Sequence, residues 1–112
     1  MTPKLNRKLN LETLYRTRDD AGGYTESWHS LGVLWASVLP GSGREAELEG
    51  LTISSVPYKI TVRAAPIGAA SRPKPGQRLR DGSRNFRLVA VTEAKTDARY
   101  LICFAREEEV AT

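Results

Sequence analysis

Apolar and polar residues alternate with a period of two along most of this chain, which is the pattern of half-buried β-strands. The clearest run has Tyr58, Ile60, Val62 and Ala64 on one face, with polar residues between them. Five or six strands joined by short turns predict a mainly β fold, and closure into a small antiparallel β-barrel would remove exposed sheet edges. The other runs cover residues 9–16, 24–39, 77–80, 84–91 and 100–104.

Glycine-containing stretches mark the turns between these runs. Residues 17–23 end in two glycines and predict a turn, because glycine accepts positive φ without steric cost. Asp81 and Gly82 stand between two strand-like runs and predict a tight hairpin. Inside the long second run, residues 30–32 predict a bulge or bend. Two further connections are expected over residues 65–76 and 92–99.

The run over residues 24–39 carries both tryptophans and has apolar residues on both faces. Val33 and Trp35 share one face, and Leu34 lies on the other. We therefore expect a strand covered on both sides, with Trp28 and Trp35 as structural anchors and Trp35 buried in the core or against another subunit. Base stacking is the alternative role for tryptophans on a small barrel.

Pro40 ends this run, because proline has no N–H to donate to a strand ladder. Ser42 and Glu45 follow with the spacing of a helix capping box, in which each side chain bonds the backbone amide of the other. We predict one short helix, or a loop with helical turns, over residues 43–51. Such a short and polar helix is marginal alone, so a subunit partner could supply the missing burial.

The chain has 112 residues, enough for one domain with one modest core. We divide it into a basic N-terminal arm (1–8), a barrel (9–105) with a protruding loop or helix (41–52), and an acidic tail (106–112). No apolar run has the length of a membrane span, and no apolar segment follows the basic N-terminal residues as it does in a secretory signal. We therefore expect no membrane partner and folding in a cytoplasm.

Charge is distributed unevenly along the chain, although the net charge is only +4. Acidic residues gather at 45–49 and at 107–109. This distribution suits a subunit that meets different neighbours at different ends, and a basic surface is also compatible with phosphate contacts. Between residues 59 and 87 a single acid accompanies eight basic interface candidates, which are Lys59, Arg63, Arg72, Lys74, Arg78, Arg80, Arg84 and Arg87.

Candidate catalytic and metal-binding groups are few. The one histidine, His29, lies in a strand-like run without neighbouring ligands, so a position on a strand surface is expected. Cys103 is flanked by Ile102 and Phe104, which predicts a buried thiol rather than a nucleophile. We therefore predict no enzyme activity, no metal and no cofactor.

Six short motifs in a fixed order resemble the head–tail joining proteins of tailed bacteriophages, also described as head-completion, head-closure or stopper proteins. The motifs are residues 9–12 (LNLE), 19–28 (DDAGGYTESW), 34–40 (LWASVLP), 42–45 (SGRE), 58–63 (YKITVR) and 81–88 (DGSRNFRL). Their ordered combination carries the resemblance, which extends over about residues 5–106. The family includes proteins of phage-like gene transfer particles.

The resemblance implies a structural subunit of the neck of a virion or phage-like particle, assembled in the host bacterial cytoplasm. It implies a homo-oligomeric ring, sixfold in preference to twelvefold, between portal or adaptor proteins and a tail terminator or tail tube protein. The ring would close the filled head, offer the tail attachment site, and let DNA pass without sequence-specific recognition. The alternative is a stand-alone small barrel that binds nucleic acid, with salt-sensitive binding to free DNA. The loop expected to face the channel or a neighbouring subunit contains Gly41, Ser42, Gly43, Arg44, Glu45, Glu47 and Glu49.

Overall fold

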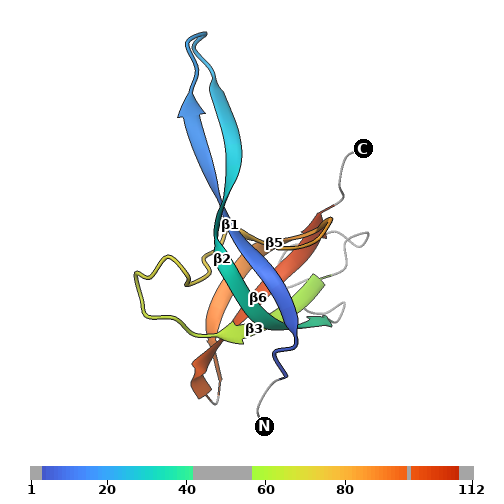
Figure 1. Ribbon diagram of the computed structural model, residues 1–112. Coiled ribbons are helices and arrows are strands. Elements are labelled where there is room, and N and C mark those ends of the chain that lie inside the picture. The colour runs from blue at the N-terminus through green and yellow to red at the C-terminus, as the bar shows by residue number, and fades with distance from the viewer. Residues whose placement is uncertain (1–3, 42–56, 96, 109–112) are drawn as a thin grey trace.

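The computed structural model describes residues 4–41, 57–95 and 97–108, and within these residues it contains strands and no helix. The strands pair antiparallel and close into a barrel in the order β1-β2-β3-β6-β5-β4 (Figure 1). The prediction of a mainly β fold with five to six strands is confirmed, whereas the helix predicted over 43–51 lies outside the described residues. The strands are β1 (Arg7–Arg18), β2 (Tyr24–Pro40), β3 (Pro57–Arg63), β4 (Arg78–Asp81), β5 (Arg84–Ala94) and β6 (Asp97–Glu108).

One apolar cluster fills the barrel, because every second residue of each strand points inward. On β3, Ile60 and Val62 are fully buried while Lys59 and Thr61 beside them are partly exposed. Cys103 is also in the cluster, and burial raises the pKa of its thiol to about 12, which confirms the predicted buried cysteine. The cluster contains Leu9, Leu11, Ala36, Ile60, Val62, Leu79, Phe86, Leu88, Leu101, Cys103 and Ala105.

A β-bulge in β2 confirms the irregularity predicted at residues 30–32. Leu11 of β1 pairs with Gly32, but the next residue, Glu12, pairs with Ser30, so Leu31 is an extra residue in β2. Gly32 has a φ of 126°, a conformation that residues with a side chain rarely adopt. The bulge changes the direction of the strand at the point where it leaves the barrel.

A second bulge, at Val89, changes which residues of β5 face the core. Strict alternation would place Phe86, Leu88 and Ala90 on one side, but the register shifts between Leu88 and Ala90. Phe86 and Leu88 are buried, and after the shift Val91 rather than Ala90 packs against the core. A bulge inserts one residue, so the inward-facing parity changes beyond it.

Among the described residues, the barrel part of β2 is covered on one face only. Ala36 is fully buried, whereas Trp35 is 56% exposed, and Val33 and Leu39 on the same face are also exposed. The prediction that Trp35 belongs to the core is therefore wrong. Both faces of this run are apolar, and closure of the barrel turns the Ala36 face inward and leaves the Trp35 face outside.

Several strands extend beyond their predicted limits. β1 begins at Arg7, inside the predicted N-terminal arm, and β6 continues to Glu108, inside the predicted acidic tail. β5 and β6 also take up most of the connection predicted over residues 92–99. Cross-strand ion pairs such as Arg84–Glu107 help to keep the polar strand ends in the ladder.

Candidate functional site

The largest departure from a simple barrel is a protruding hairpin formed by residues 13–30. β1 pairs with β4 only at residues 10–12, and β2 pairs with β3 only at residues 36–40. Between these limits, residues 13–18 and 24–29 pair only with one another among the described residues, and they stand clear of the barrel (Figure 1). At about 3.4 Å per residue, the six residues of each side extend the hairpin by about 20 Å.

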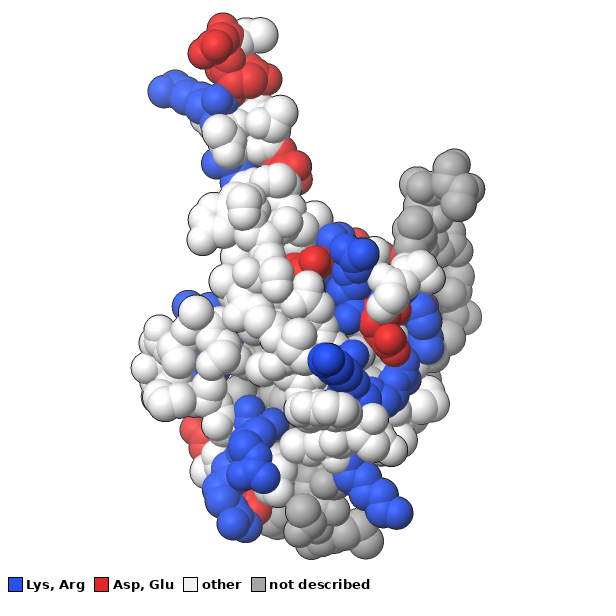
Figure 2. Space-filling model, viewed as in Figure 1, with Lys and Arg blue, Asp and Glu red and all other residues white. Residues whose placement is uncertain are grey.

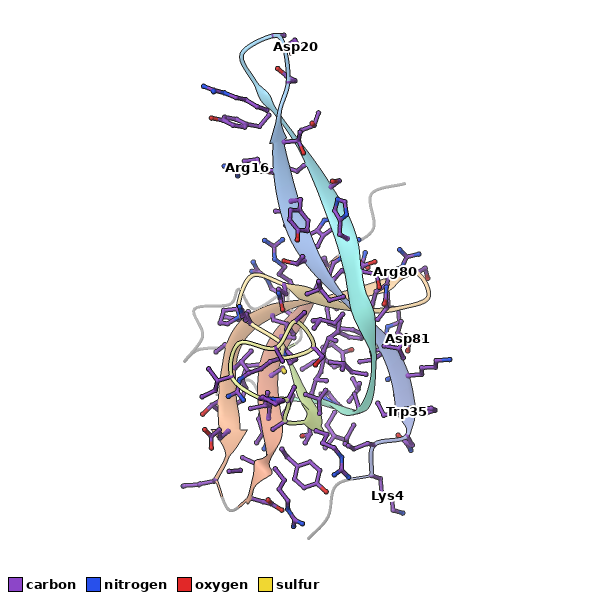
Figure 3. The ribbon with its side chains drawn as sticks, turned by 60° about the vertical axis from the view of Figure 1, so that its left-hand side comes forward. Lys4, Arg16, Asp20, Trp35, Arg80 and Asp81 are labelled. Atoms are coloured by element: carbon purple, nitrogen blue, oxygen red, sulfur yellow. The ribbon has the colours of Figure 1, made fainter. Side chains whose placement is uncertain are left out.

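Asp19 holds the turn at the tip of the protruding hairpin. Its carboxylate accepts hydrogen bonds from the backbone N–H groups of Ala21 and Gly23, at 2.9 and 2.8 Å. Its own N–H donates to the Gly23 carbonyl at 3.0 Å, and Gly22 has a φ of 85°. The turn predicted at residues 17–23 is therefore confirmed, and exposed Asp20 lies at the far end of the molecule (Figure 3).

Cross-strand contacts tie the two sides of the protruding hairpin together, but its surface remains exposed. Arg16 and Glu26 form an ion pair at 2.9 Å, which adds little stability because both side chains are in solvent. Tyr15 and Tyr24 are 53% and 60% exposed. A two-stranded ribbon is marginally stable alone in water, so this hairpin offers a surface that a partner can stabilise.

His29 lies exposed on the protruding hairpin, as predicted. Its Nε2 is 3.0 Å from the Ser27 hydroxyl, and its ring meets the Tyr15 ring edge-on with centroids 4.6 Å apart. In the described part of the chain, no three His, Cys, Asp or Glu side chains are placed to share a metal ion. The same part holds no helix with the length and hydropathy needed to cross a membrane.

Trp28 braces the root of the protruding hairpin against β4 and β5. The guanidinium carbon of Arg78 lies 4.2 Å from the centroid of the Trp28 ring, and that of Arg87 lies 5.1 Å from it. Cation–π contacts of this kind contribute about 0.5–2 kcal/mol each, with the larger values in desolvated sites. These contacts place Trp28 between the hairpin and the barrel, and its role as a structural anchor stays a prediction.

A buried ion pair joins the same root to β4. The Glu12 side chain is 7% exposed, and its Oε1 accepts a hydrogen bond from Nε of Arg78 at 2.6 Å. Its Oε2 accepts from Nδ2 of Asn10 at 3.3 Å and lies 3.6 Å from Nη1 of Arg80. Because a buried carboxylate requires such partners, this network and Trp28 fix the direction in which the hairpin leaves the barrel.

Asp81 and Gly82 lie in the predicted hairpin turn, which is confirmed. Asp81 pairs with Arg84, leaving a two-residue loop, and Gly82 has a φ of 60°. Positive φ at the first loop residue is typical of a type II′ turn, which matches the twist of the flanking strands. The Asp81 carboxylate also bonds Arg7, so the turn is tied to the start of β1.

The basic interface candidates do not form one surface. On β5, Arg84 bonds Glu107 at 2.8 Å, and Arg87 lies 3.8 Å from Glu108. The hydrogen bond from Arg84 lowers the pKa of Glu107 below its ordinary value. On β4, Arg78 and Arg80 face Glu12, so the β4–β5 arginines are engaged within the chain. The other four are Lys59 and Arg63 on β3 and Arg72 and Lys74 in the loop before β4.

A second exposed surface lies on the barrel. It consists of Val33, Trp35 and Leu39 with Lys8 and Lys59, and we call it the outer β2 face. Lys8 pairs with Trp35 and Lys59 pairs with Leu39, and directly paired residues point to the same side of a sheet. The three apolar side chains are 51–58% exposed. Of the six large apolar side chains that the described residues expose, five lie here or on the protruding hairpin.

The loop predicted to face a channel leaves the barrel and returns to it at one place. Gly41 donates its N–H to the Pro57 carbonyl at 2.7 Å, and Pro40 pairs with Tyr58. This place and the protruding hairpin lie at opposite ends of β2. The loop candidates that lie outside the described residues are Ser42, Gly43, Arg44, Glu45, Glu47 and Glu49.

Sequence reasoning missed both the protruding hairpin and its Glu12 brace. Alternation over residues 9–16 has the same period whether the strand faces a core or leaves it. A usable signal is the change of residue type along one face of β1, where Leu9 and Leu11 are followed by Thr13 and Tyr15. A strand face that loses its aliphatic residues can no longer fill a barrel interior.

Two of three comparisons with known proteins found matches, and these two agree with each other. The chain matches the family model described as phage head completion protein over residues 1–108. A chain in the virion of a native gene transfer agent particle is 49% identical, with a TM-score of 0.78 and coverage of 98% of this chain and 100% of that chain. Protein SF1141 from Shigella flexneri 2a, whose structure was solved in solution, is 25% identical, with a TM-score of 0.68 and 93% of each chain covered.

The search of curated proteins found no match. The family model nevertheless spans nearly all of the sequence, and the first of the two solved structures shares almost half of its residues with this chain over its full length. Both solved structures also share the fold of the described barrel. The chain therefore belongs to the phage head completion protein family.

Proposed function

We propose that this protein is a ring-forming subunit of the neck, seated between the portal or adaptor proteins and the tail terminator or tail tube protein. Family membership supports a structural role in head completion. The proposal of a ring rests on the exposure of two unlike surfaces, the protruding hairpin and the outer β2 face. Identical subunits form closed rings through contacts between two different surfaces, and we propose six subunits in preference to twelve.

The pairing of charges favours this role over that of a stand-alone DNA-binding barrel. Four of the eight basic candidates face Glu12, Glu107 or Glu108 at 2.6–3.8 Å. An arginine that is already paired with a carboxylate binds a phosphate with a smaller net free energy, because the existing ion pair must first be broken. DNA would therefore pass through the proposed ring without being held by this side of the barrel.

The loop over residues 41–52 is the proposed channel-facing element. The hydrogen bond between Gly41 and Pro57 joins the two described residues that flank the segment containing this loop. Glu45, Glu47 and Glu49 would repel the phosphates of passing DNA, because like charges close together in a ring raise the local negative potential. Closure of the head would then depend on the shape of the loop and on neighbouring proteins.

The proposed position is tested by removing the protein from the particle that encodes it. We expect particles that package DNA but lose it, and that carry no tails. Purified protein added to such heads should restore DNA retention and tail attachment. Particles that lack the protein and are nevertheless tailed and filled would contradict the proposal.

The loop is tested by two matched variants. Deletion of residues 44–50 is expected to leave the barrel folded and to cause DNA leakage or loss of tails. The triple substitution of Glu45, Glu47 and Glu49 by glutamine keeps the length and removes only the charge, so it should slow DNA exit while heads still close. Stable, tailed and filled particles from the deletion would exclude the loop as a gate or joint.

A further inference from the structure

We propose that the protruding hairpin of one subunit lies across the outer β2 face of the next subunit, with its acidic tip against Lys8 and Lys59. This inference rests on the proposed ring and identifies its subunit contact. It follows from the exposure, the charge and the reach of the two surfaces.

Neither surface is covered by another part of the chain that the structure describes. Tyr15 and Tyr24 on the hairpin and Val33, Trp35 and Leu39 on the outer β2 face are all more than half exposed. Residues 24–35 of β2 also have a backbone edge that no described strand pairs with. Long unpaired edges beside apolar side chains are usually covered in native assemblies, so we expect a partner to bind each surface.

The two surfaces have complementary charge. Residues 13–30 contain three acids and two arginines, whereas the whole chain has 17 basic and 13 acidic residues. Arg16 neutralises Glu26, which leaves Asp19 and Asp20 with Arg18 at the tip. Lys8 and Lys59 take part in no ion pair among the described residues. Figure 2 shows acidic side chains at the tip with basic ones just below them, and mainly basic side chains over the barrel.

A chain cannot make this contact with itself. Asp20 lies at the tip of the hairpin, far from Trp35 on the barrel (Figure 3), and the contacts of Glu12 and Trp28 direct the hairpin away from the barrel. The hairpin extends about 20 Å, whereas the outer β2 face spans three neighbouring strands that lie about 4.8 Å apart, so the hairpin is long enough to cross this face. A neighbouring barrel therefore offers a surface of the right size.

A second copy of this chain is the occupant that fits both surfaces at once. The two surfaces differ from each other, and every copy of the chain carries both, so one copy can bind the next. A contact between unlike surfaces of identical subunits leaves one hairpin and one outer β2 face still available at the ends of any open chain of subunits. In a closed ring, every hairpin and every outer β2 face is in contact with a neighbouring subunit.

The contact is tested on assembled wild-type particles with a carbodiimide, which joins a carboxylate to a lysine amine only when the two touch. We expect a cross-link between Asp19 or Asp20 of one copy and Lys8 or Lys59 of another, located by mass spectrometry. The control variant replaces both Lys8 and Lys59 with arginine, which keeps the charge but removes the reactive amine. This control should lose the cross-link and keep the yield of tailed particles.

Other cross-links would overturn the inference. Linkage of the tip to a different virion protein would show that the hairpin binds that protein. Linkage to Lys4, Lys74 or Lys95 of a second copy would show a different subunit contact. Absence of any link from Asp19 or Asp20 in particles that contain the protein would also exclude the contact.

A pair of truncations tests whether the outer β2 face is needed for assembly. Trp35→Ala should reduce the yield of tailed particles by about tenfold or more, since buried interface tryptophans dominate binding energy. Its thermal midpoint should stay close to that of the wild type, because Trp35 is 56% exposed in the single chain. Ile67→Ala removes an 87% exposed side chain from the loop before β4 and should leave the yield unchanged.

Failure of this inference is distinguishable from failure of the proposed function. If heads lacking the protein regain tails when it is added, but Trp35→Ala assembles normally and the tip is linked elsewhere, only the contact proposed here is wrong. If particles without the protein are tailed and filled, the neck role itself is wrong, whatever the cross-links show.

Discussion

Replacement of Glu12 by glutamine should be among the most destabilising polar substitutions in the described residues. The side chain is 7% exposed, and its main partner, Arg78, has a side chain that is 16% exposed. Glutamine has nearly the same shape but no charge, so the change isolates the ion pair. It leaves the Arg78 guanidinium without a carboxylate at a site with little access to water.

The size of the effect follows from the burial of the pair. Two unit charges about 4 Å apart attract by about 4 kcal/mol at an effective dielectric constant of about 20. Removal of one partner from a buried pair typically costs about 3–5 kcal/mol, because the remaining charge stays desolvated. The second contact of Glu12, to Arg80 at 3.6 Å, adds less because the Arg80 side chain is 51% exposed.

We therefore expect Glu12→Gln to lower the free energy of unfolding by about 3 kcal/mol. A domain of this size loses about 4 °C in thermal midpoint per kcal/mol, so the midpoint should fall by about 12 °C. Urea denaturation and calorimetry measure both quantities. Glu26→Gln is the matched control, because the Arg16–Glu26 pair is exposed and its loss should cost less than about 0.5 kcal/mol.

The double variant Glu12→Gln, Arg78→Met separates the ion pair from other effects. If the pair acts as inferred, the double variant should lose about 1–3 kcal/mol less unfolding free energy than the sum of the losses in the two single variants. A Glu12→Gln protein as stable as Glu26→Gln, or strictly additive single effects, would refute the buried ion pair as the brace of the protruding hairpin.

Three further predictions concern other parts of the barrel. Burial raises the pKa of Cys103 to about 12, so a thiol reagent at pH 8 should label the folded protein at least about a hundredfold more slowly than the unfolded protein, and equal rates would contradict its burial. The Arg84 hydrogen bond lowers the pKa of Glu107, so this pair stabilises the fold above the ordinary glutamate value of 4.5 and loses that contribution as the pH falls. Wild type should therefore lose more stability than Glu107→Gln between pH 6 and pH 3, as measured by urea denaturation. Gly82→Val places a β-branched residue at a φ of 60° and should destabilise the fold by more than about 1 kcal/mol, whereas Ser83→Val, at a position without positive φ, is the control.

The sequence predicted the parts of this fold that depend on local chemistry. Alternation located the strands, since side chains point to opposite faces at every second residue. Glycine located the bulge at Gly32 and the hairpin turn at Gly82, because both positions have positive φ. The apolar neighbours of Cys103 located a buried thiol.

The sequence also identified the outward tryptophan face of β2 as apolar, but alternation could not say which face a core would cover. Leu34 and Trp35 are adjacent and both apolar, so either could point inward. The register of β2 against β1 and β3, together with barrel closure, turns the Leu34 side toward the core and leaves Trp35 outside.

Only the tertiary structure determined the contacts between residues that are far apart in the chain. Glu12 and Arg78 are separated by 66 positions, and nothing local to either residue identifies the other as its partner. The same holds for the limits of β1–β4 and β2–β3 pairing, which determine where the two long strands leave the barrel. Strand periodicity records only which way a side chain points, whereas the length of each neighbouring strand determines whether the residue meets a core, a partner or solvent.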